Sequence, residues 1–303
     1  MFLKELGRTG VRISEVGIGT SGYEGGPGPL RRGLERGALF IDTAESYGAE
    51  AVVGEAVRGI RDRVFIATKI SPEHFRPADV RHSVDASLLR LGVDTIDLLQ
   101  LHHSNPAIPI HETMGAVGEM ADAGKIRFCG VSNFSLDQLR DAQKALSRHP
   151  VVSNQVRFNL IDRTIEAGLL QYCQAEQITV IAYSPLAASL DRILDCDASG
   201  TLAEITRVTG KSPAQIAINW CLCRDGIVAI PKGGSEEHIL ENCGASDWRL
   251  STEQIALLDR KIQYRRRNWL AQFVRRSMPQ PLRNISASVV RSLPRSLRRR
   301  VLY

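Results

Sequence analysis

The sequence lacks the long apolar segment that a membrane-spanning helix requires. Its apolar runs are far shorter than the roughly 18 consecutive residues that such a helix needs. The opening residues, Met-Phe-Leu-Lys-Glu-Leu-Gly, also lack the basic and then apolar layout of a secretion signal. These two absences predict a protein of the cytoplasm.

Cysteine and histidine are few and scattered. The six cysteines form no Cys-x-x-Cys pair and have no regular spacing, which argues against a disulfide framework. The seven histidines show no metal-ligand spacing. Cys221 and Cys223 lie two residues apart in a predicted helix, so their side chains do not face each other. We therefore expect buried free thiols and no bound metal.

Acidic residues are absent from the end of the chain. From Arg260 onward there are 13 Lys and Arg residues and neither Asp nor Glu, although the whole chain has 33 acidic residues and a net charge of +6. The body is therefore mildly acidic and the tail strongly basic. This asymmetry predicts a folded domain over residues 1–262 and a basic, amphipathic C-terminal extension over residues 263–303.

Within the folded domain, short apolar runs alternate with segments of helical periodicity. Strands are predicted at 14–19, 38–42, 64–69, 95–101, 126–131, 151–157, 178–183 and 227–231. Helical segments include 79–91, 111–123, 136–147, 167–177, 213–224 and 236–242. Eight alternations in about 230 residues indicate an α/β fold with a parallel sheet, and favour a closed (β/α)8 TIM barrel. Residues 2–13, around Gly-Arg-Thr-Gly, predict a short N-terminal β-hairpin.

Polar residues stand at the ends of three successive predicted strands. Asp42 ends the first and Tyr47 follows it in the loop, Lys69 ends the second, and His102 ends the third. Because the chemistry of such barrels takes place at the C-terminal ends of the strands, these residues predict one proton-handling site. Each also has a structural interpretation, as a helix cap, a loop tyrosine or a solvated lysine. Neighbouring residues on a strand point to opposite faces, so only one of His102 and His103 should reach the site. Strand periodicity does not show which one, since both faces of that strand are apolar.

A glycine motif suggests a competing fold. Gly17-Ile18-Gly19-Thr20-Ser21-Gly22 is followed 20 residues later by Asp42, which is the spacing of a dinucleotide-binding Rossmann fingerprint. That fingerprint requires a helix that begins at the glycines. The residues that follow, Tyr-Glu-Gly-Gly-Pro-Gly-Pro, exclude a helix before about Leu30. We favour a flexible glycine loop at the mouth of a barrel.

Over roughly residues 2–262 the sequence resembles the aldo-keto reductase superfamily. Seven segments carry the resemblance, in the family's order and on the expected strands. They are Phe-Ile-Asp-Thr-Ala-Glu-Ser-Tyr-Gly (40–48), Ile-Ala-Thr-Lys (66–69), Ile-Asp-Leu-Leu-Gln-Leu-His (96–102), Gly-Lys-Ile-Arg-Phe-Cys-Gly-Val-Ser-Asn-Phe (124–134), Asn-Gln-Val-Arg-Phe-Asn (154–159), Ala-Tyr-Ser-Pro-Leu (182–186) and Ile-Pro-Lys-Gly-Gly (230–234).

The resemblance implies NAD(P)H-dependent reduction of an aldehyde or ketone, or the reverse oxidation. Tyr47 would be the general acid, with its pKa lowered by the Lys69 ammonium. Asp42 would pair with Lys69, and His102, which the family pattern selects over His103, would orient the carbonyl. The rival interpretation is a nucleotide-binding regulatory or docking subunit that keeps the fold and has little turnover.

The resemblance also implies three groups of cofactor contacts, to the nicotinamide, the pyrophosphate and the adenosine end. They are Ser132, Asn133, Gln155 and Tyr183 for the nicotinamide, Ser184 and Leu186 for the pyrophosphate, and Lys232, Ser235, His238, Glu241 and Asn242 for the adenosine end.

One residue and one short segment depart from the family pattern. His238 stands where many members have an arginine for the 2′-phosphate of NADPH, and a neutral imidazole is the weaker partner. We expect NADPH because Lys232 is kept, with NADH as the alternative. His-His-Ser-Asn-Pro (102–106) replaces the common His-Trp-Pro, so we expect a pocket without that aromatic wall and a polar or sugar-like substrate.

The C-terminal extension keeps three interpretations open. Its arginine clusters flank apolar residues at helical spacing, namely Trp269, Leu270, Phe273 and Val274. It packs over the barrel and shapes the substrate pocket; or it binds an anionic membrane surface or a protein partner; or it is a solvated basic segment that touches nucleic acid only weakly. We expect no specific nucleic-acid partner.

Overall fold

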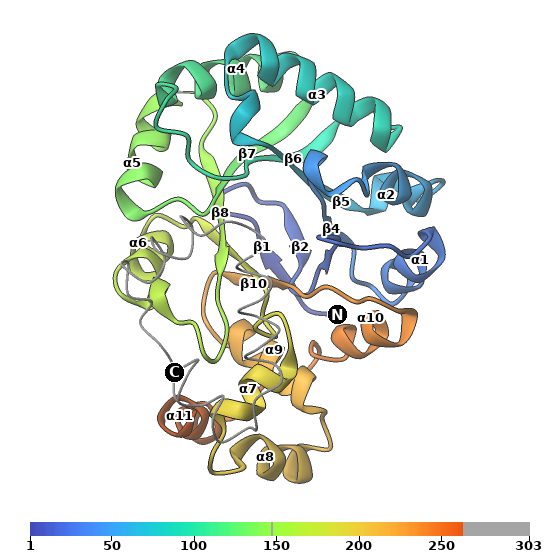
Figure 1. The fold of residues 1–303 in the computed structure, drawn as a ribbon, viewed down its shortest axis with the longest axis vertical. Coiled ribbons are helices and arrows are strands. Elements are labelled where there is room, and N and C mark those ends of the chain that lie inside the picture. Colours follow the sequence, from blue (N-terminus) through green and yellow to red (C-terminus); the bar gives the residue numbers. More distant parts are fainter. Residues whose placement is uncertain (147, 263–303) are drawn as a thin grey trace, which may run out of the picture.

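Eight parallel strands form one sheet around a central axis. The structure, a computed structural model, describes residues 1–146 and 148–262. The strands are adjacent in chain order, without a reversal. They are β3 (Ile18–Gly19), β4 (Phe40–Asp42), β5 (Phe65–Ile70), β6 (Ile96–Leu101), β7 (Ile126–Ser132), β8 (Val151–Arg157), β9 (Thr179–Tyr183) and β10 (Ile227–Ile230) (Figure 1). This arrangement confirms the predicted (β/α)8 barrel.

Backbone contacts between the first and last strands close the barrel. The Gly17 amide donates to the Ala229 carbonyl at 2.8 Å, and the Gly19 amide donates to the Pro231 carbonyl at 3.1 Å. A Cβ on Gly19 would lie 2.8 Å from the Ile230 carbonyl oxygen, so only glycine permits this approach. Gly17 and Gly19 are therefore wall residues, and the expectation that they form a flexible mouth loop is wrong.

Eleven α-helices are found in the described residues, and most surround the strands (Figure 1). Six correspond to the helical segments named from the sequence, and the other five are α1, α2, α7, α8 and α11. They are α1 (Pro27–Glu35), α2 (Glu50–Val57), α3 (Pro77–Leu91), α4 (Ile110–Asp122), α5 (Leu136–Ala145), α6 (Leu169–Ala175), α7 (Leu190–Cys196), α8 (Thr201–Thr209), α9 (Pro213–Leu222), α10 (Glu236–Cys243) and α11 (Thr252–Lys261).

Capping residues explain several helix starts and one misplaced boundary. Ser212 and Gln215 form a capping box at α9, and Ser251 and Gln254 form one at α11. Helix α1 begins at Pro27, three residues before the predicted limit of Leu30. A proline is tolerated in the first turn because the N–H that it lacks would have no partner within the helix. The helix still does not begin at the glycine motif, so the Rossmann alternative fails on this point as well as on strand order.

The predicted hairpin closes the N-terminal end of the barrel. Strands β1 (Leu3–Glu5) and β2 (Arg12–Ser14) pair antiparallel. Leu6, which follows β1, and Ile13 of β2 join the apolar cluster inside the barrel, with residues of β4, β5, β6, β8, β9 and β10. The predicted strand over 14–19 is thus divided, because the chain leaves its hairpin partner after Ser14 and pairs in the barrel only at β3.

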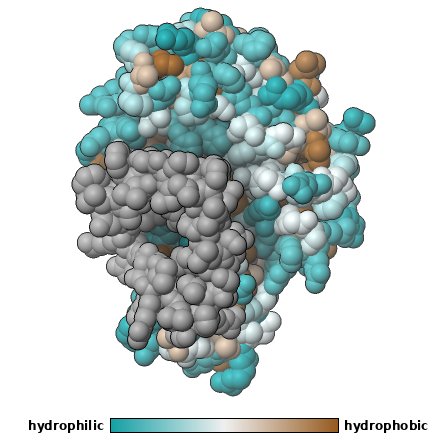
Figure 2. Space-filling view, in the orientation of Figure 1, coloured by the Kyte–Doolittle hydropathy of each residue, from teal (hydrophilic) through white to brown (hydrophobic). Residues whose placement is uncertain are grey.

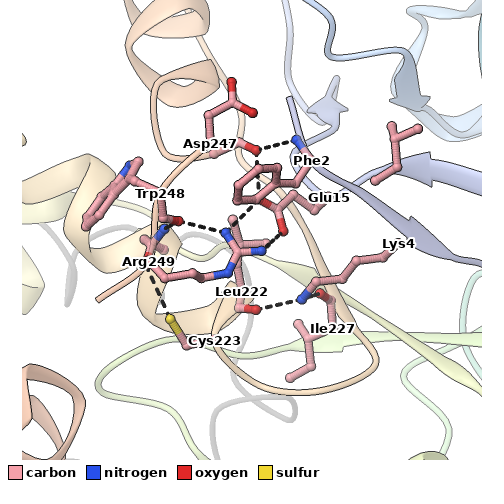
Figure 3. Close-up of polar contacts among 12 residues, drawn as sticks. Phe2, Lys4, Glu15, Leu222, Cys223, Ile227, Asp247, Trp248 and Arg249 are labelled. Carbon is pink, nitrogen blue, oxygen red and sulfur yellow. Dashed lines mark hydrogen bonds and ion pairs between the residues drawn. The ribbon is translucent and has the colours of Figure 1, made fainter. Parts of the chain in front are cut away.

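Charged contacts hold the hairpin to the last strand–helix units (Figure 3). The Lys4 ammonium donates to the carbonyls of Leu222 at 2.6 Å and Ile227 at 2.8 Å. Leu222 is the last residue of α9, where a cation satisfies carbonyls that the helix leaves open. The buried carboxylate of Glu15 accepts hydrogen bonds from Arg249 and from Ser246. The chain start is therefore fixed to segments more than 200 residues away.

We expect Lys4→Met to lower the free energy of unfolding by about 1–3 kcal/mol, because the carbonyls of Leu222 and Ile227 lose a charged donor. Urea denaturation measures the change. Lys144→Met is the control, since the Lys144 side chain is 79% exposed and its change should stay within about 0.5 kcal/mol. Equal effects of the two substitutions would contradict the anchoring role.

The surface and the cysteines complete this description. The described residues on the face in Figure 2 are mostly hydrophilic, with separate small apolar spots. No helix among them is long and apolar enough to cross a bilayer. All six cysteines are free, and five are buried. The interpretations of residues 263–303 lie outside the described residues.

Candidate active site

A buried ion pair lies at the C-terminal end of the barrel interior. Asp42 ends β4, and Lys69 lies near the end of β5, the next strand. Asp42 is in register with Ala67, and Lys69 lies two residues further along β5, so both side chains point inward. The Lys69 Nζ lies 2.5 Å from Asp42 Oδ1 and donates to the Thr43 carbonyl at 2.7 Å. Both side chains are almost fully buried.

Two amides complete the environment of the Asp42 carboxylate. Its Oδ2 accepts from Gln155 Nε2 at 2.7 Å and from Gln100 Nε2 at 3.3 Å. The carboxylate is thereby satisfied on both oxygens, which a buried charge requires. Gln155 was predicted as a cofactor contact, whereas Gln100 was missed. Gln100 lies on β6 in register with Lys69 of β5. The available signal was a polar side chain inside the largely apolar run 96–101.

A short 3-10 turn, η1 (Glu45–Tyr47), places Tyr47 over this pair. The Lys69 Nζ lies 4.9 Å from the centroid of the Tyr47 ring. The Tyr47 hydroxyl lies 3.2 Å from Nε2 of His102, which follows β6. Glu45 ties η1 to the next loop by accepting from the Ser71 amide at 2.6 Å. The structure thus brings together the four residues predicted from the strand ends.

Burial sets the protonation of both rings. It raises the pKa of Tyr47 above its ordinary value of 10.0, and the Asp42 carboxylate adds to that rise. This direction is opposite to the expectation that Lys69 lowers it, because Asp42 opposes the ammonium and burial penalises the phenolate. Burial, with the charges of Lys69 and His103, also lowers the pKa of His102 to about 4. Near neutral pH, Tyr47 therefore keeps its proton and His102 is uncharged.

The residues predicted for the nicotinamide lie directly beside this group. Asn133, with a left-handed φ of 60°, donates through Nδ2 to the His102 carbonyl at 3.1 Å. The Tyr183 hydroxyl donates to Asn133 Oδ1 at 2.9 Å. Ser132 donates to the Gln155 carbonyl at 3.0 Å. Strands β7, β8 and β9 thus extend the polar group that β4, β5 and β6 begin.

The residues predicted for the rest of the cofactor lie along the following loops. The carbonyl of Ser184 accepts from Asn159 at 3.0 Å, and Leu186 packs against the outer core. The exposed Lys232 donates to the Gly22 carbonyl at 2.9 Å. The remaining four residues lie on or beside α10. Ser235 is its N-cap and accepts a hydrogen bond from the backbone amide of His238. Glu241 and the buried Asn242 lie near the end of the same helix.

A polar cavity of about 420 Å³ adjoins the site. It is lined by the exposed His103 and by four other residues, Pro72, Ser104, Asn133 and Gln138. The His103 ring stacks on the His102 ring with centroids 5.2 Å apart. His102 therefore faces Tyr47, while His103 faces the cavity. The lining contains no large aromatic side chain.

No group of His, Cys, Asp and Glu residues in the described ranges could hold a metal ion. A parallel (β/α)8 barrel with ionisable groups and a cavity at its C-terminal mouth has the architecture of a barrel enzyme. The Aldo/keto reductase family model matches residues 29–263. The chain belongs to the aldo/keto reductase family.

Similar proteins carry the names of reductases. Methylglyoxal reductase YeaE of Escherichia coli (strain K12) is 36% identical over 234 residues, which cover 76% of this chain and 82% of the relative. The thermostable aldo-keto reductase Tm1743, solved with the inhibitor epalrestat, has a TM-score of 0.81 and 39% identity, covering 86% of this chain and 99% of that one. An aldo-keto reductase from Klebsiella pneumoniae, solved with NADPH, has a TM-score of 0.81 and 35% identity, covering 88% and 98%. This chain is an oxidoreductase of that family.

Proposed function

We propose that the protein reduces small aldehydes or ketones with NADPH, with Tyr47 as the proton donor. The observation that carries this proposal is the 3.2 Å contact between the Tyr47 hydroxyl and His102 Nε2, directly over the buried Asp42–Lys69 pair. A general acid must lie within hydrogen-bond reach of the substrate oxygen, and a carbonyl that accepts from both rings would meet this condition.

The residues at the mouth fit a nicotinamide cofactor. The hydroxyl of Ser132 and the amides of Asn133 and Gln155 are donors and acceptors suited to a carboxamide, and the Tyr183 ring is suited to a flat heterocycle. Lys232 would supply a positive charge for a phosphate. A reduced nicotinamide held by these residues would supply the hydride that the carbonyl carbon accepts.

The side chains have separate roles in this reduction. Tyr47, protonated at neutral pH, donates its proton to the carbonyl oxygen, and the alcohol forms. The Lys69 ammonium, held by Asp42, lies close to the phenolate that remains and stabilises it until solvent returns the proton. His102, uncharged, donates a hydrogen bond that orients the carbonyl. In the reverse reaction the same phenolate accepts the proton of the alcohol.

The cavity favours small polar substrates. Its lining of His103, Ser104 and Gln138 offers hydrogen bonds and no aromatic wall. The related E. coli protein is named for methylglyoxal, a small 2-oxoaldehyde. We propose that this protein also acts on small, oxygen-rich aldehydes.

The pH profile follows from the lowered pKa of His102. A pKa near 4 means that the ring is uncharged at every pH above about 5 and gains its proton only below that. We expect kcat/KM for aldehyde reduction to be flat from about pH 5.5 to 7.5 and to fall toward pH 4. A decline with a midpoint near 6.5 that disappears in His102→Gln would contradict the lowered pKa.

Lys232 makes the choice between NADPH and NADH testable. Its ammonium is exposed beside α10, where the family pattern expects the 2′-phosphate. We expect Lys232→Met to raise the Kd of NADPH about tenfold, because one charge-assisted contact is lost, and to leave the Kd of NADH unchanged. His238→Arg should lower the Kd of NADPH. Fluorescence titration measures both, and parallel changes for the two nucleotides would contradict the assignment.

The rival is a docking subunit, for which the C-terminal extension would be the contact element. We propose instead that residues 1–262 are the catalytic unit and that the enzyme works in the cytoplasm, in keeping with its six free thiols. The test compares NADPH consumption by the full chain and by a variant lacking residues 264–303, with alcohol formation checked by chromatography. Turnover of small aldehydes by both proteins supports the proposal. Nucleotide binding without turnover by the full chain would favour the docking subunit.

A further inference from the structure

One arginine at the barrel mouth faces the proposed site. Arg157 is the last residue of β8 and lies in register with Tyr183 of β9. Gln155, two residues earlier, points into the barrel and donates to Asp42. Strand alternation turns Arg157 to the same side, one level nearer the mouth. Its guanidinium carbon lies 5.4 Å from the centroid of the Tyr183 ring.

The positive charge of Arg157 has no carboxylate partner in the described part of the chain. The side chain is partly buried, and its Nε is fully buried without a hydrogen-bond partner. The residues outside the described ranges, 147 and 263–303, contain neither Asp nor Glu. By comparison, Arg90 pairs with Glu50 at 2.6 Å. A buried guanidinium nitrogen without a partner is costly, which suggests that a ligand supplies one.

The surroundings of Arg157 are those of the reacting groups. Tyr183, under the guanidinium, donates to Asn133, and Asn133 donates to the His102 carbonyl. Asn133 also lines the polar cavity. Successive contacts therefore join Arg157 to the site of proton transfer. Lys69, the buried cation beside Tyr47, is paired with Asp42, whereas Arg157 has no carboxylate partner among the described residues and can accept an anion.

We propose that Arg157 binds a carboxylate carried by the substrate, so that the enzyme prefers aldehydes or ketones that bear an acid group. This inference rests on the proposed reductase function and deepens it. A guanidinium presents two parallel N–H donors that match the two oxygens of a carboxylate. An acid group bound at Arg157 orients the remainder of the substrate toward Tyr47 and His102.

The test uses two substrates of nearly equal shape, 4-carboxybenzaldehyde and its neutral methyl ester. Steady-state kinetics with NADPH are measured for the wild type and for Arg157→Gln and Arg157→Lys. We expect Arg157→Gln to lower kcat/KM about tenfold or more for the acid, mainly through KM, and less than about twofold for the ester. Arg157→Lys should retain part of the preference, because it keeps the charge and loses the fork. An equal fall in kcat/KM of Arg157→Gln for both substrates, or no fall for either, would overturn the proposal.

Arg140→Gln is the matched control. Arg140 lies on α5 with its guanidinium carbon 4.8 Å from the Tyr172 ring, so the same Arg–Tyr contact is removed outside the mouth. This variant should leave the ratio of the two substrates unchanged. The Kd of NADPH is measured for each variant by fluorescence. If the Kd of NADPH rose in Arg157→Gln by the same factor as its kcat/KM fell, Arg157 would be assigned to a cofactor phosphate and the proposal would be overturned.

A binding measurement separates this proposal from the proposed function. Benzoate and benzamide are titrated calorimetrically into the wild type saturated with NADP⁺, where no turnover is required. Tighter binding of benzoate that is lost in Arg157→Gln supports the carboxylate site, even for a protein that reduces neither aldehyde. Equal binding of the two compounds to the wild type would overturn it.

Discussion

Tyr47→Phe is expected to lower kcat for aldehyde reduction by at least about a hundredfold, because a positioned general acid contributes two to four orders of magnitude. The substitution removes one hydroxyl, which lies 3.2 Å from His102 Nε2, and keeps the ring over Lys69. The Kd of NADPH should change less than about twofold. Steady-state rates and fluorescence titration give the two quantities.

Tyr172→Phe is the control for this prediction. The Tyr172 hydroxyl donates to Gln143 at 2.8 Å, between α6 and α5, so its loss also removes one hydrogen bond but leaves the site intact. We expect this variant to retain the wild-type kcat. A Tyr47→Phe enzyme as active as Tyr172→Phe would show that another group donates the proton.

Lys69→Met is expected to reduce both activity and stability. It leaves the buried Asp42 carboxylate without its cation, and breaking a buried ion pair costs about 3–5 kcal/mol. Activity should fall because the phenolate of Tyr47 loses its nearest positive charge. Chemical denaturation and the kinetic assay measure the two effects. The double variant Lys69→Met, Asp42→Asn should lose less free energy of unfolding than the sum of the two single variants, because the neutral amide leaves no unpaired buried charge.

The exposed pair Lys125–Asp85 provides a control with the same separation. Its Nζ–Oδ1 distance is also 2.5 Å, but both side chains are more than one third exposed. Lys125→Met should therefore cost less than about 1 kcal/mol. If Lys69→Met were no more destabilising than Lys125→Met, burial would not be the source of the effect.

The residues at strand ends were predictable because a parallel barrel has a simple geometry. Asp42, Lys69 and His102 each end an apolar run, and the carboxyl ends of parallel strands share one end of the barrel. The structure brings these residues together with Tyr47, and it places Ser132, Asn133, Gln155 and Tyr183 beside them. Local pattern and one topological rule predicted that Asp42, Tyr47, Lys69 and His102 would meet, whereas the other four residues, and the choice of His102 over His103, came from the family resemblance.

What the sequence did not reveal depends on contacts between distant segments. The division of 14–19 between β2 and β3 is set by a hairpin partner and by closure against β10. The buried amide of Gln100 acquires its role only from Asp42 on another strand. The direction of the Tyr47 pKa shift was missed because it depends on how deeply the ring is buried. Arg157 could have been found by counting two residues from Gln155 along β8.

The measurement that tests the account most directly is NADPH oxidation by the full-length protein with a panel of small aldehydes, run beside Tyr47→Phe. The account predicts loss of NADPH absorbance with stoichiometric alcohol formation for the wild type. It predicts at least about hundredfold slower turnover for Tyr47→Phe at unchanged nucleotide affinity. A wild type that binds NADPH and reduces no aldehyde, or a Tyr47→Phe variant of equal rate, would contradict it.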